Sequence, residues 1–98
     1  MAKFYLTKKA VEDLNDIWNY TYEEWSERQA DKYYFSLLKS IQLLAEKPNS
    51  GKKYDIVLTE LLGYKSEQHI IFYSVLSTNE IEVVRILHGS MDLKSKFE

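Results

Sequence analysis

The spacing of hydrophobic and polar residues divides the chain into two helical segments and a group of strands. Apolar side chains recur every three or four residues across residues 11–25, and again across residues 30–45. Such spacing places them along one face of a helix. The segment between the two patterns is short, so we expect the two helices to pack as an antiparallel hairpin.

Polar residues that can cap helices mark the expected helix ends. Thr7 precedes the first helical segment, and the sequence S-E-R-Q at residues 26–29 fits a capping box in which Ser26 begins the second helix. Pro48 and the polar loop around it end that helix, because proline cannot continue the backbone hydrogen bonding.

Strand-like patterns lie on both sides of this hairpin in the sequence. Residues 3–6 are short, aromatic and alternating, which is typical of a strand. Residues 69–76 are almost wholly apolar and predict a strand covered on both faces, with residues 81–88 as its partner across a turn. Residues 56–64 have mixed periodicity, and we expect a strand only near residues 62–65.

Together these elements predict one α+β domain that spans residues 1–98. The expected order is β-α-α-β-β-β, with the N-terminal helix hairpin packed on one face of a small antiparallel sheet. A chain of 98 residues has the size of a single domain with one core.

Composition narrows the classes of protein to which the chain can belong. Cysteine is absent, which excludes disulfides and thiolate metal sites and fits a reducing cytoplasm. No apolar stretch is long enough for a signal peptide or a membrane span, so we expect a cytoplasmic protein without direct membrane binding. The net charge of −2 argues against nucleic acid as the main ligand.

The stretch E-V-V-R-I-L-H-G-S-M-D at residues 82–92 is a dense group of polar side chains. His88, Ser90 and Asp92 are the residue types of a serine-hydrolase triad. In an extended chain they lie about 6.6 Å apart in steps, too far for hydrogen bonds between neighbours. No G-x-S-x-G motif surrounds Ser90, and we therefore expect no triad.

Metal and cofactor sites are not indicated either. His69 and His88 lack the spacing of a metal-binding motif, and Asp13 and Asp16 are expected on a solvated helix face. The three glycines are isolated, so the sequence has no phosphate-binding loop and we expect no cofactor.

Arg85 lies in an apolar strand, where we expect Ile81, Val83 and Leu87 to share its face. A partly desolvated arginine needs a carboxylate or phosphate partner, and an ion pair with a helix carboxylate is favoured. The alternative is a metal-free RNA-cleaving site with His88 as acid or base. The cations that would hold phosphate in such a site are Arg85, Lys52, Lys53 and Lys65.

Aromatic residues are frequent, at 14% of the chain. A domain this small does not bury all of them, so we expect some to form a surface for a protein partner. Those expected near the turn of the helix hairpin are Tyr20, Tyr22, Trp25, Tyr33 and Tyr34.

Several motifs, in order along nearly the whole chain, resemble those of ParE-type toxins in the RelE/ParE superfamily. The family pattern L-[ST]-x-x-A-x-x-D-L-x-x-I corresponds to Leu6, Thr7, Ala10, Asp13, Leu14 and Ile17, and A-x-x-Y in the second helix to Ala30 and Tyr33. Residues 48–55 (P-N-S-G-K-K-Y-D), 69–73 (H-I-I-F-Y) and 83–92 (V-V-R-I-L-H-G-S-M-D) are similar to later family motifs. The usual basic residue and glycine before H-x-I-F-Y are replaced by Ser66, Glu67 and Gln68.

The resemblance implies the compact RelE-like α+β fold and a role as the toxin of a type II toxin–antitoxin system. It also implies a ParD-like antitoxin, a small DNA-binding protein that wraps a helix and an extended tail around the toxin. DNA would be contacted only through that complex. ParE-type members poison DNA gyrase without being enzymes, whereas RelE-type relatives cut mRNA on the ribosome.

The resemblance and the chemistry together assign expected roles to residues. The segment for the target, which is needed for toxicity, contains Arg85, His88, Met91, Asp92, Lys94 and Phe97. The residues expected to bind the antitoxin are Tyr22, Trp25, Tyr33, Tyr34, Lys52, Lys65 and Arg85.

Three functions follow from these assignments. A gyrase inhibitor has no catalytic residue and fits the acidic balance of the chain. A RelE-type endonuclease would use His88 and Arg85, but no tyrosine follows Tyr73 to act as a C-terminal catalytic group. The third alternative is an inactive member that serves only to bind its antitoxin.

Overall fold

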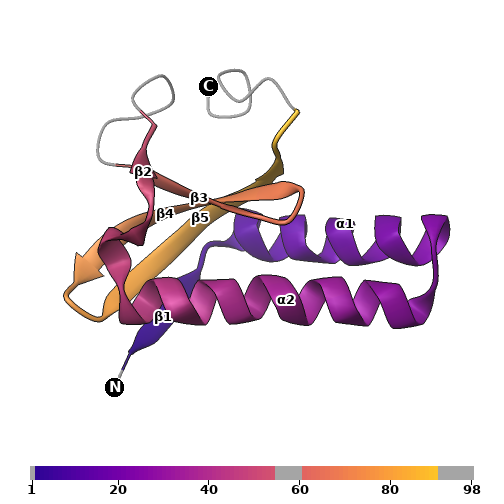
Figure 1. The fold of residues 1–98 in the computed structure, drawn as a ribbon, viewed down its shortest axis with the longest axis horizontal. Helices are drawn as coiled ribbons and strands as arrows, with labels where there is room; N and C mark the ends of the chain where they lie inside the picture. The colour runs from indigo at the N-terminus through magenta and orange to yellow at the C-terminus, as the bar shows by residue number, and fades with distance from the viewer. Residues whose placement is uncertain (1, 55–60, 91–98) are drawn as a thin grey trace.

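The computed structural model describes residues 2–54 and 61–90 (Figure 1). Strand β1 (Lys3–Leu6) leads into helices α1 (Lys8–Glu24) and α2 (Glu27–Glu46). A short 3-10 turn, η1 (Pro48–Ser50), precedes β2 (Lys52–Lys53), β3 (Leu62–Ser66), β4 (His69–Ser77) and β5 (Glu80–His88). The predicted α+β architecture, with a helix hairpin on one side of a sheet, is confirmed.

Both predicted helix caps are present. The Thr7 hydroxyl accepts the backbone N–H of Ala10 at 3.1 Å, and the Ser26 hydroxyl accepts that of Gln29 at the same distance. Each cap satisfies an N–H that the first helical turn leaves without a partner. The connection between the helices is a single turn around Trp25 and Ser26, so α1 and α2 lie antiparallel and side by side (Figure 1).

The sheet differs from the expectation in two pairings. The described strands form one sheet in the order β1-β5-β4-β3-β2, and β1 runs parallel to β5, so the sheet is mixed and not wholly antiparallel. No hairpin constrains β1, because its partner lies at the other end of the sequence, and either direction is then possible. The two-residue strand β2, which the sequence pattern did not predict, pairs antiparallel with β3.

The core lies on both faces of β4, as predicted. Ile71 and Tyr73 are fully buried in the main cluster with the apolar faces of α1 and α2. Ile70 and Phe72 point to the other face, where they form a second cluster with Leu61 and Leu87. Burial on both faces explains why this strand reads as a continuous apolar run.

A β-bulge in β5 corrects the predicted face of Arg85. The register with β4 shifts between Phe72 opposite Arg85 and Tyr73 opposite Val83. The extra residue puts Arg85 in register with Phe72, although its guanidinium reaches Asp13 on α1. Leu87 packs in the second cluster, while Val83 and Ile81 pack in the main cluster against the helices. The expectation that all four share a face is therefore wrong, because a bulge interrupts the period of two.

Tyr73 ties the loop after α2 to the core. Its hydroxyl donates to the Pro48 carbonyl at 2.6 Å and accepts the Gly51 N–H at 2.9 Å. A Cβ at Gly51 would lie 2.5 Å from this hydroxyl, so only glycine fits at the contact. Of the helices in the described ranges, none is both long and apolar enough to cross a bilayer.

Candidate functional site

The helix hairpin extends beyond the end of the sheet (Figure 1). Side chains of the hairpin and of the strand ends line a cleft where the two meet. The cleft has a volume of about 420 Å³. Its walls come from the C-terminal half of α1, the N-terminal half of α2 and the ends of β4 and β5. The lining residues are Tyr20, Thr21, Trp25, Gln29, Tyr33, Gln68, His69 and His88. We call this space the histidine cleft.

Two histidines form the floor of the histidine cleft. His69 begins β4 and His88 ends β5, and the antiparallel register places them directly opposite each other. Their ring centroids are 5.2 Å apart and the rings are nearly perpendicular. Two further hollows, of about 410 and 190 Å³, continue along α1 past Asp16 and Ile17 and share both histidines.

Tyr33 holds His69 and the β3–β4 turn against α2. The Tyr33 hydroxyl accepts the Gln68 N–H at 3.1 Å, and its oxygen lies 2.7 Å from His69 Nδ1. Burial, with a smaller contribution from the nearby His88, lowers the pKa of His69 to about 4. His69 is therefore neutral at pH 7. Because the Tyr33 oxygen already accepts the Gln68 N–H, we assign its O–H as the donor to His69 Nδ1. Burial also raises the pKa of Tyr33, which keeps that proton in place.

The turn next to Tyr33 contains a strained residue. Glu67 is the one non-glycine residue with a positive φ in the described ranges, at 58°. A left-handed conformation at a residue with a Cβ is costly, so the hydrogen bond from Gln68 to Tyr33 helps to stabilise the turn.

His88 is bonded to Ser90, which corrects one step of the sequence argument. The chain turns after β5, so Ser90 N–H donates to His88 Nδ1 at 3.1 Å and Ser90 Oγ lies 2.7 Å from the same nitrogen. The spacing argument applied to an extended chain, and the chain folds back at this point. The contact still differs from a triad, because Ser90 occupies the nitrogen that an orienting carboxylate would need. Asp92 lies outside the described residues.

Arg85 forms the ion pair that the sequence favoured. Its Nε and Nη2 donate to the two carboxylate oxygens of Asp13 on α1, at 2.8 and 3.0 Å. The Ile86 N–H donates to the same carboxylate at 3.0 Å. Asp13 thereby bonds the edge of β5 beyond the point where β1 ends. The pKa of Arg85 is raised above its ordinary value. The largest cause is the hydrogen bond to Asp13, and the negative charge of Asp13 adds a smaller contribution.

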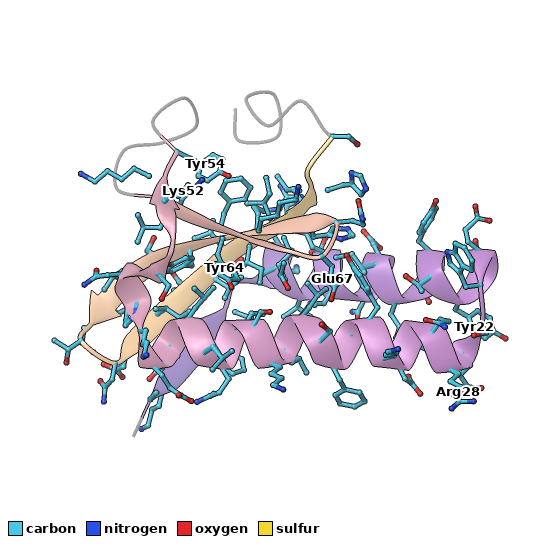
Figure 2. All side chains as sticks on the ribbon, viewed as in Figure 1. Tyr22, Arg28, Lys52, Tyr54, Tyr64 and Glu67 are labelled. Carbon is cyan, nitrogen blue, oxygen red and sulfur yellow. The ribbon has the colours of Figure 1, made fainter. Side chains whose placement is uncertain are left out.

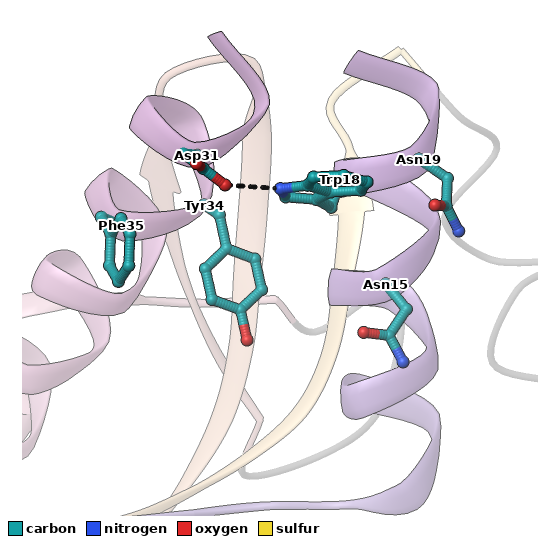
Figure 3. Close-up of a pocket in the computed structure, with 6 residues that line it drawn as sticks. All are labelled: Asn15, Trp18, Asn19, Asp31, Tyr34 and Phe35. Atoms are coloured by element: carbon teal, nitrogen blue, oxygen red, sulfur yellow. Dashed lines mark hydrogen bonds between the residues drawn. The ribbon is translucent and has the colours of Figure 1, made fainter. Parts of the chain in front are cut away.

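The aromatic residues predicted to cluster near the hairpin turn lie at different sites on the helix hairpin. Trp25 and Tyr33 line the histidine cleft. Tyr22 instead stacks on Trp18, with ring centroids 5.3 Å apart, near the closed end of the hairpin (Figure 2). Tyr34 lines a separate hollow of about 520 Å³ between α1 and α2. In this hollow Trp18 Nε1 donates to Asp31 at 2.9 Å (Figure 3).

Two of the predicted basic residues lie apart from His88, whereas Arg85 shares a hollow with it. Lys52 pairs with Gly63, opposite Phe72, and lies on the face of the sheet away from the helices (Figure 2). Lys65 pairs with Ile70 and so lies on the same face. His88 and His69 lie on the helix face, where His69 contacts Tyr33. The sheet therefore separates the two lysines from the histidines. Met91, Asp92, Lys94 and Phe97 of the predicted target segment lie outside the described residues.

Sequence reasoning missed the pairing of His69 with His88. The sequence did contain a signal for it. Ser77 pairs with Glu80 at the turn, and moving eight residues outward along each strand places His69 opposite His88. Sequence reasoning also missed the bonds of Tyr33 and Trp18, which depend on how α2 packs. Within the described ranges, no three histidine, aspartate or glutamate side chains are grouped to hold a metal ion.

Comparisons with known proteins identify the family. A family model described as the ParE toxin of the type II toxin–antitoxin system parDE matches residues 4–93. The chain is 32% identical over 95 residues to the toxin ParE1 of Caulobacter vibrioides, covering 97% of each chain. It is 32% identical over 92 residues to the toxin ParE1 of Mycobacterium tuberculosis, covering 94% of each. It is 31% identical over 96 residues to the toxin ParE of Escherichia coli, covering 98% of this chain and 93% of that one.

A solved structure agrees at the level of the fold. The chromosomal ParDE toxin–antitoxin system of P. aeruginosa contains a chain that superposes with a TM-score of 0.76. The match covers 90% of this chain and 96% of that chain at 20% sequence identity. The expected RelE/ParE-like fold is therefore confirmed. The chain belongs to the ParE toxin family of type II toxin–antitoxin systems.

Proposed function

We propose that this ParE-family toxin acts by binding DNA gyrase and is neutralised by a ParD-like antitoxin in the cytoplasm. The observation that carries the proposal is the match to the ParE toxin family over residues 4–93. The resemblance to that family implies gyrase as the target, without an enzymatic activity of the toxin. The solved neighbour belongs to a ParDE system, which supports an antitoxin of the ParD type as the partner.

The geometry of the described residues favours a binding protein over an endonuclease. RNA cleavage without a metal needs a proton-transfer group and cations around one phosphate. Here Arg85 is engaged by the Asp13 carboxylate, and Lys52 and Lys65 lie on the other face of the sheet from His88. The charge-stabilising groups of a nuclease are thus not assembled around the one candidate acid or base.

The proposed target contact is the end of β5 and the segment that follows it. Arg85 and His88 lie where β5 leaves the sheet. The Asp13 carboxylate fixes this exit through Arg85 and the Ile86 N–H. The remaining proposed target residues are Met91, Asp92, Lys94 and Phe97.

The proposed antitoxin surface combines exposed aromatic rings with basic residues. Trp25 is 76% exposed and Tyr22 is 51% exposed. Large aromatic rings that remain this exposed often mark a site where a partner binds. An antitoxin helix would bury such rings in a groove contact. The other proposed contacts are Tyr33, Tyr34, Lys52, Lys65 and Arg85.

A gyrase assay tests the target. Pure, folded toxin should inhibit supercoiling and increase gyrase-dependent DNA cleavage, and added antitoxin should reverse both effects. The double substitution Lys94→Ala with Phe97→Ala should weaken inhibition while antitoxin binding is retained. Unchanged supercoiling and cleavage at every toxin concentration would exclude gyrase as the target.

Two companion measurements separate the alternatives. Ribosome-dependent mRNA cleavage in a translation extract, lost in His88→Ala, would identify an endonuclease. Normal growth of cells that express the toxin alone would identify an inactive member. Growth arrest with filamentation, relieved by the antitoxin, is the expected result.

A further inference from the structure

The two histidines of the histidine cleft each have a hydrogen-bond donor that the fold does not use. His88 Nδ1 accepts the Ser90 N–H. His69 Nδ1 lies 2.7 Å from the Tyr33 hydroxyl, which we assign as the donor because its oxygen already accepts the Gln68 N–H. A neutral imidazole whose Nδ1 is an acceptor carries its proton on Nε2. The hydrogen-bond network therefore assigns an Nε2–H to both rings.

Neither Nε2–H group is fully buried in the described structure. Within the described ranges, every buried side-chain nitrogen or oxygen has a hydrogen-bond partner. The hydrogen bonds of both imidazoles to described residues go through Nδ1. Each Nε2 must therefore be accessible, and both rings line the same cavity. The result is a pair of N–H donors on adjacent strands.

The rest of the cleft restricts what these donors can bind. Its lining contains no aspartate, glutamate, lysine or arginine among the described residues. The walls are aromatic, formed by Tyr20, Trp25 and Tyr33, with the amides of Gln29 and Gln68 at the rim. A neutral cavity with paired N–H donors and ring walls fits an acceptor group on an apolar carrier. A carboxylate, with two oxygens, can accept from both rings.

We propose that the histidine cleft binds one carboxylate side chain, Asp or Glu, of the antitoxin, with a neighbouring apolar side chain packed on Trp25. This subsite deepens the proposed function and rests on it for the identity of the partner. A nucleic-acid phosphate backbone fits less well, because affinity for it depends on lysine and arginine contacts and neither type lines the cleft.

The negative charge of Asp16 allows a test of whether the bound group is negatively charged. Asp16 is exposed on α1 and lines the two adjoining hollows together with both histidines. Its negative charge opposes a carboxylate bound at the imidazoles. Replacing Asp16 by Asn should therefore strengthen carboxylate binding, whereas loss of a donor should weaken it.

Tripeptides test the subsite without the antitoxin. The acetylated and amidated peptides Leu-Glu-Leu and Leu-Gln-Leu are titrated into labelled protein, and the imidazole and Trp25 indole signals are followed by NMR. The glutamate peptide should shift these signals. The glutamine peptide should bind roughly tenfold more weakly or worse, since it cannot form the charge-assisted hydrogen bonds of a carboxylate.

Two variants assign the effect to the donors. His88→Phe keeps a ring of similar size without an N–H, and it should reduce binding of the glutamate peptide by about tenfold. Asp16→Asn should increase it, and the backbone spectrum of each variant verifies its fold. If His88→Phe unfolds the protein, Asp16→Asn and the comparison of the two peptides still decide the question.

The outcomes separate this subsite from the gyrase proposal. Equal binding of the two peptides, no binding up to millimolar concentration, or weaker binding in Asp16→Asn would each overturn the carboxylate subsite. A stronger response to an oligothymidine than to the glutamate peptide would make the cleft a nucleic-acid site. A negative gyrase assay would reject the proposed target and leave the peptide result unchanged.

Discussion

Asp13 joins helix α1 to the edge of strand β5, and its environment defines what it does. Its carboxylate accepts hydrogen bonds from Arg85 Nε, Arg85 Nη2 and the Ile86 N–H. The side chains of Arg85 and Asp13 are only 19% and 11% exposed. A buried ion pair stabilises a protein little more than a well-packed apolar pair would. Loss of one partner, however, leaves the other charge buried and poorly solvated, which destabilises the fold.

Replacing Asp13 by Asn should therefore lower the free energy of unfolding by about 2–4 kcal/mol. Urea unfolding followed by circular dichroism measures this change. Asp16→Asn is the matched control, because it removes the same charge from an exposed position on the same helix. The control should change stability by less than about 0.5 kcal/mol. Similar values for the two variants would show that the ion pair does not support the fold.

His69 makes stability depend on pH. Its folded pKa of about 4 lies below the ordinary value of 6.5, chiefly because burial disfavours the charged form. Between these values the unfolded chain binds more protons than the folded one, so stability rises with pH. The contribution is complete above pH 6.5 and is lost as the pH falls toward 4.

We expect the melting temperature to fall between pH 6.5 and pH 4, and to fall less in His69→Gln. The NMR signal of the His69 ring should titrate with a pKa near 4 in the folded protein. Gln retains an acceptor for the Tyr33 hydroxyl but cannot take up a proton in this range. A His69 pKa close to 6.5 would contradict the burial argument.

At the scale of the elements, Thr7 connects two of them at once. Its hydroxyl caps α1 by accepting the Ala10 N–H, and it donates to the Val84 carbonyl of β5 at 2.7 Å. Val84 is the bulged residue of that strand. One side chain thus stabilises a helix end and a carbonyl that the interrupted ladder would otherwise leave unpaired.

Thr7→Ala should lower the free energy of unfolding by about 2 kcal/mol, the sum of a cap and one hydrogen bond. Ser26→Ala is the matched comparison, because Ser26 provides only a helix cap, at an exposed site. It should cost about 1 kcal/mol. Chemical denaturation of both variants measures the difference, and an equal loss would mean that the bond to Val84 adds nothing.

At the scale of the whole molecule, the position of the hairpin beyond the sheet determines which rings are available to a partner. Trp25 closes the turn between α1 and α2 and is 76% exposed. Its backbone N–H donates to the Thr21 carbonyl, while its ring forms one wall of the histidine cleft. Removing that ring should leave the core intact.

Trp25→Ala should weaken antitoxin binding by about 2 kcal/mol, roughly thirtyfold, with little change in the melting temperature. Calorimetric titration with the antitoxin measures the affinity. Phe35→Ala is the control, because Phe35 is also largely exposed, at 65%, but lies on the other side of the hairpin in the hollow between the helices. A comparable loss of affinity in both variants would reject a specific role for Trp25.

Much of the architecture was predictable because it depends on local pattern. The helix ends at Thr7 and Ser26 follow from capping chemistry within a few residues. The apolar run of β4 predicted that both of its faces are buried. The sequence predicted that Arg85 pairs with a helix carboxylate, because a desolvated guanidinium needs such a partner, but it did not identify Asp13.

The sequence by itself determined the family, the helix hairpin and the two strands around the final turn. Only the tertiary structure decided that β1 runs parallel to β5, that a bulge shifts the register next to Arg85, and that Trp25 and Tyr33 meet the two histidines. Periodicity and capping act between residues a few positions apart. Strand direction, bulges and the contents of a cleft depend on how distant segments pack, and no local pattern contains that information.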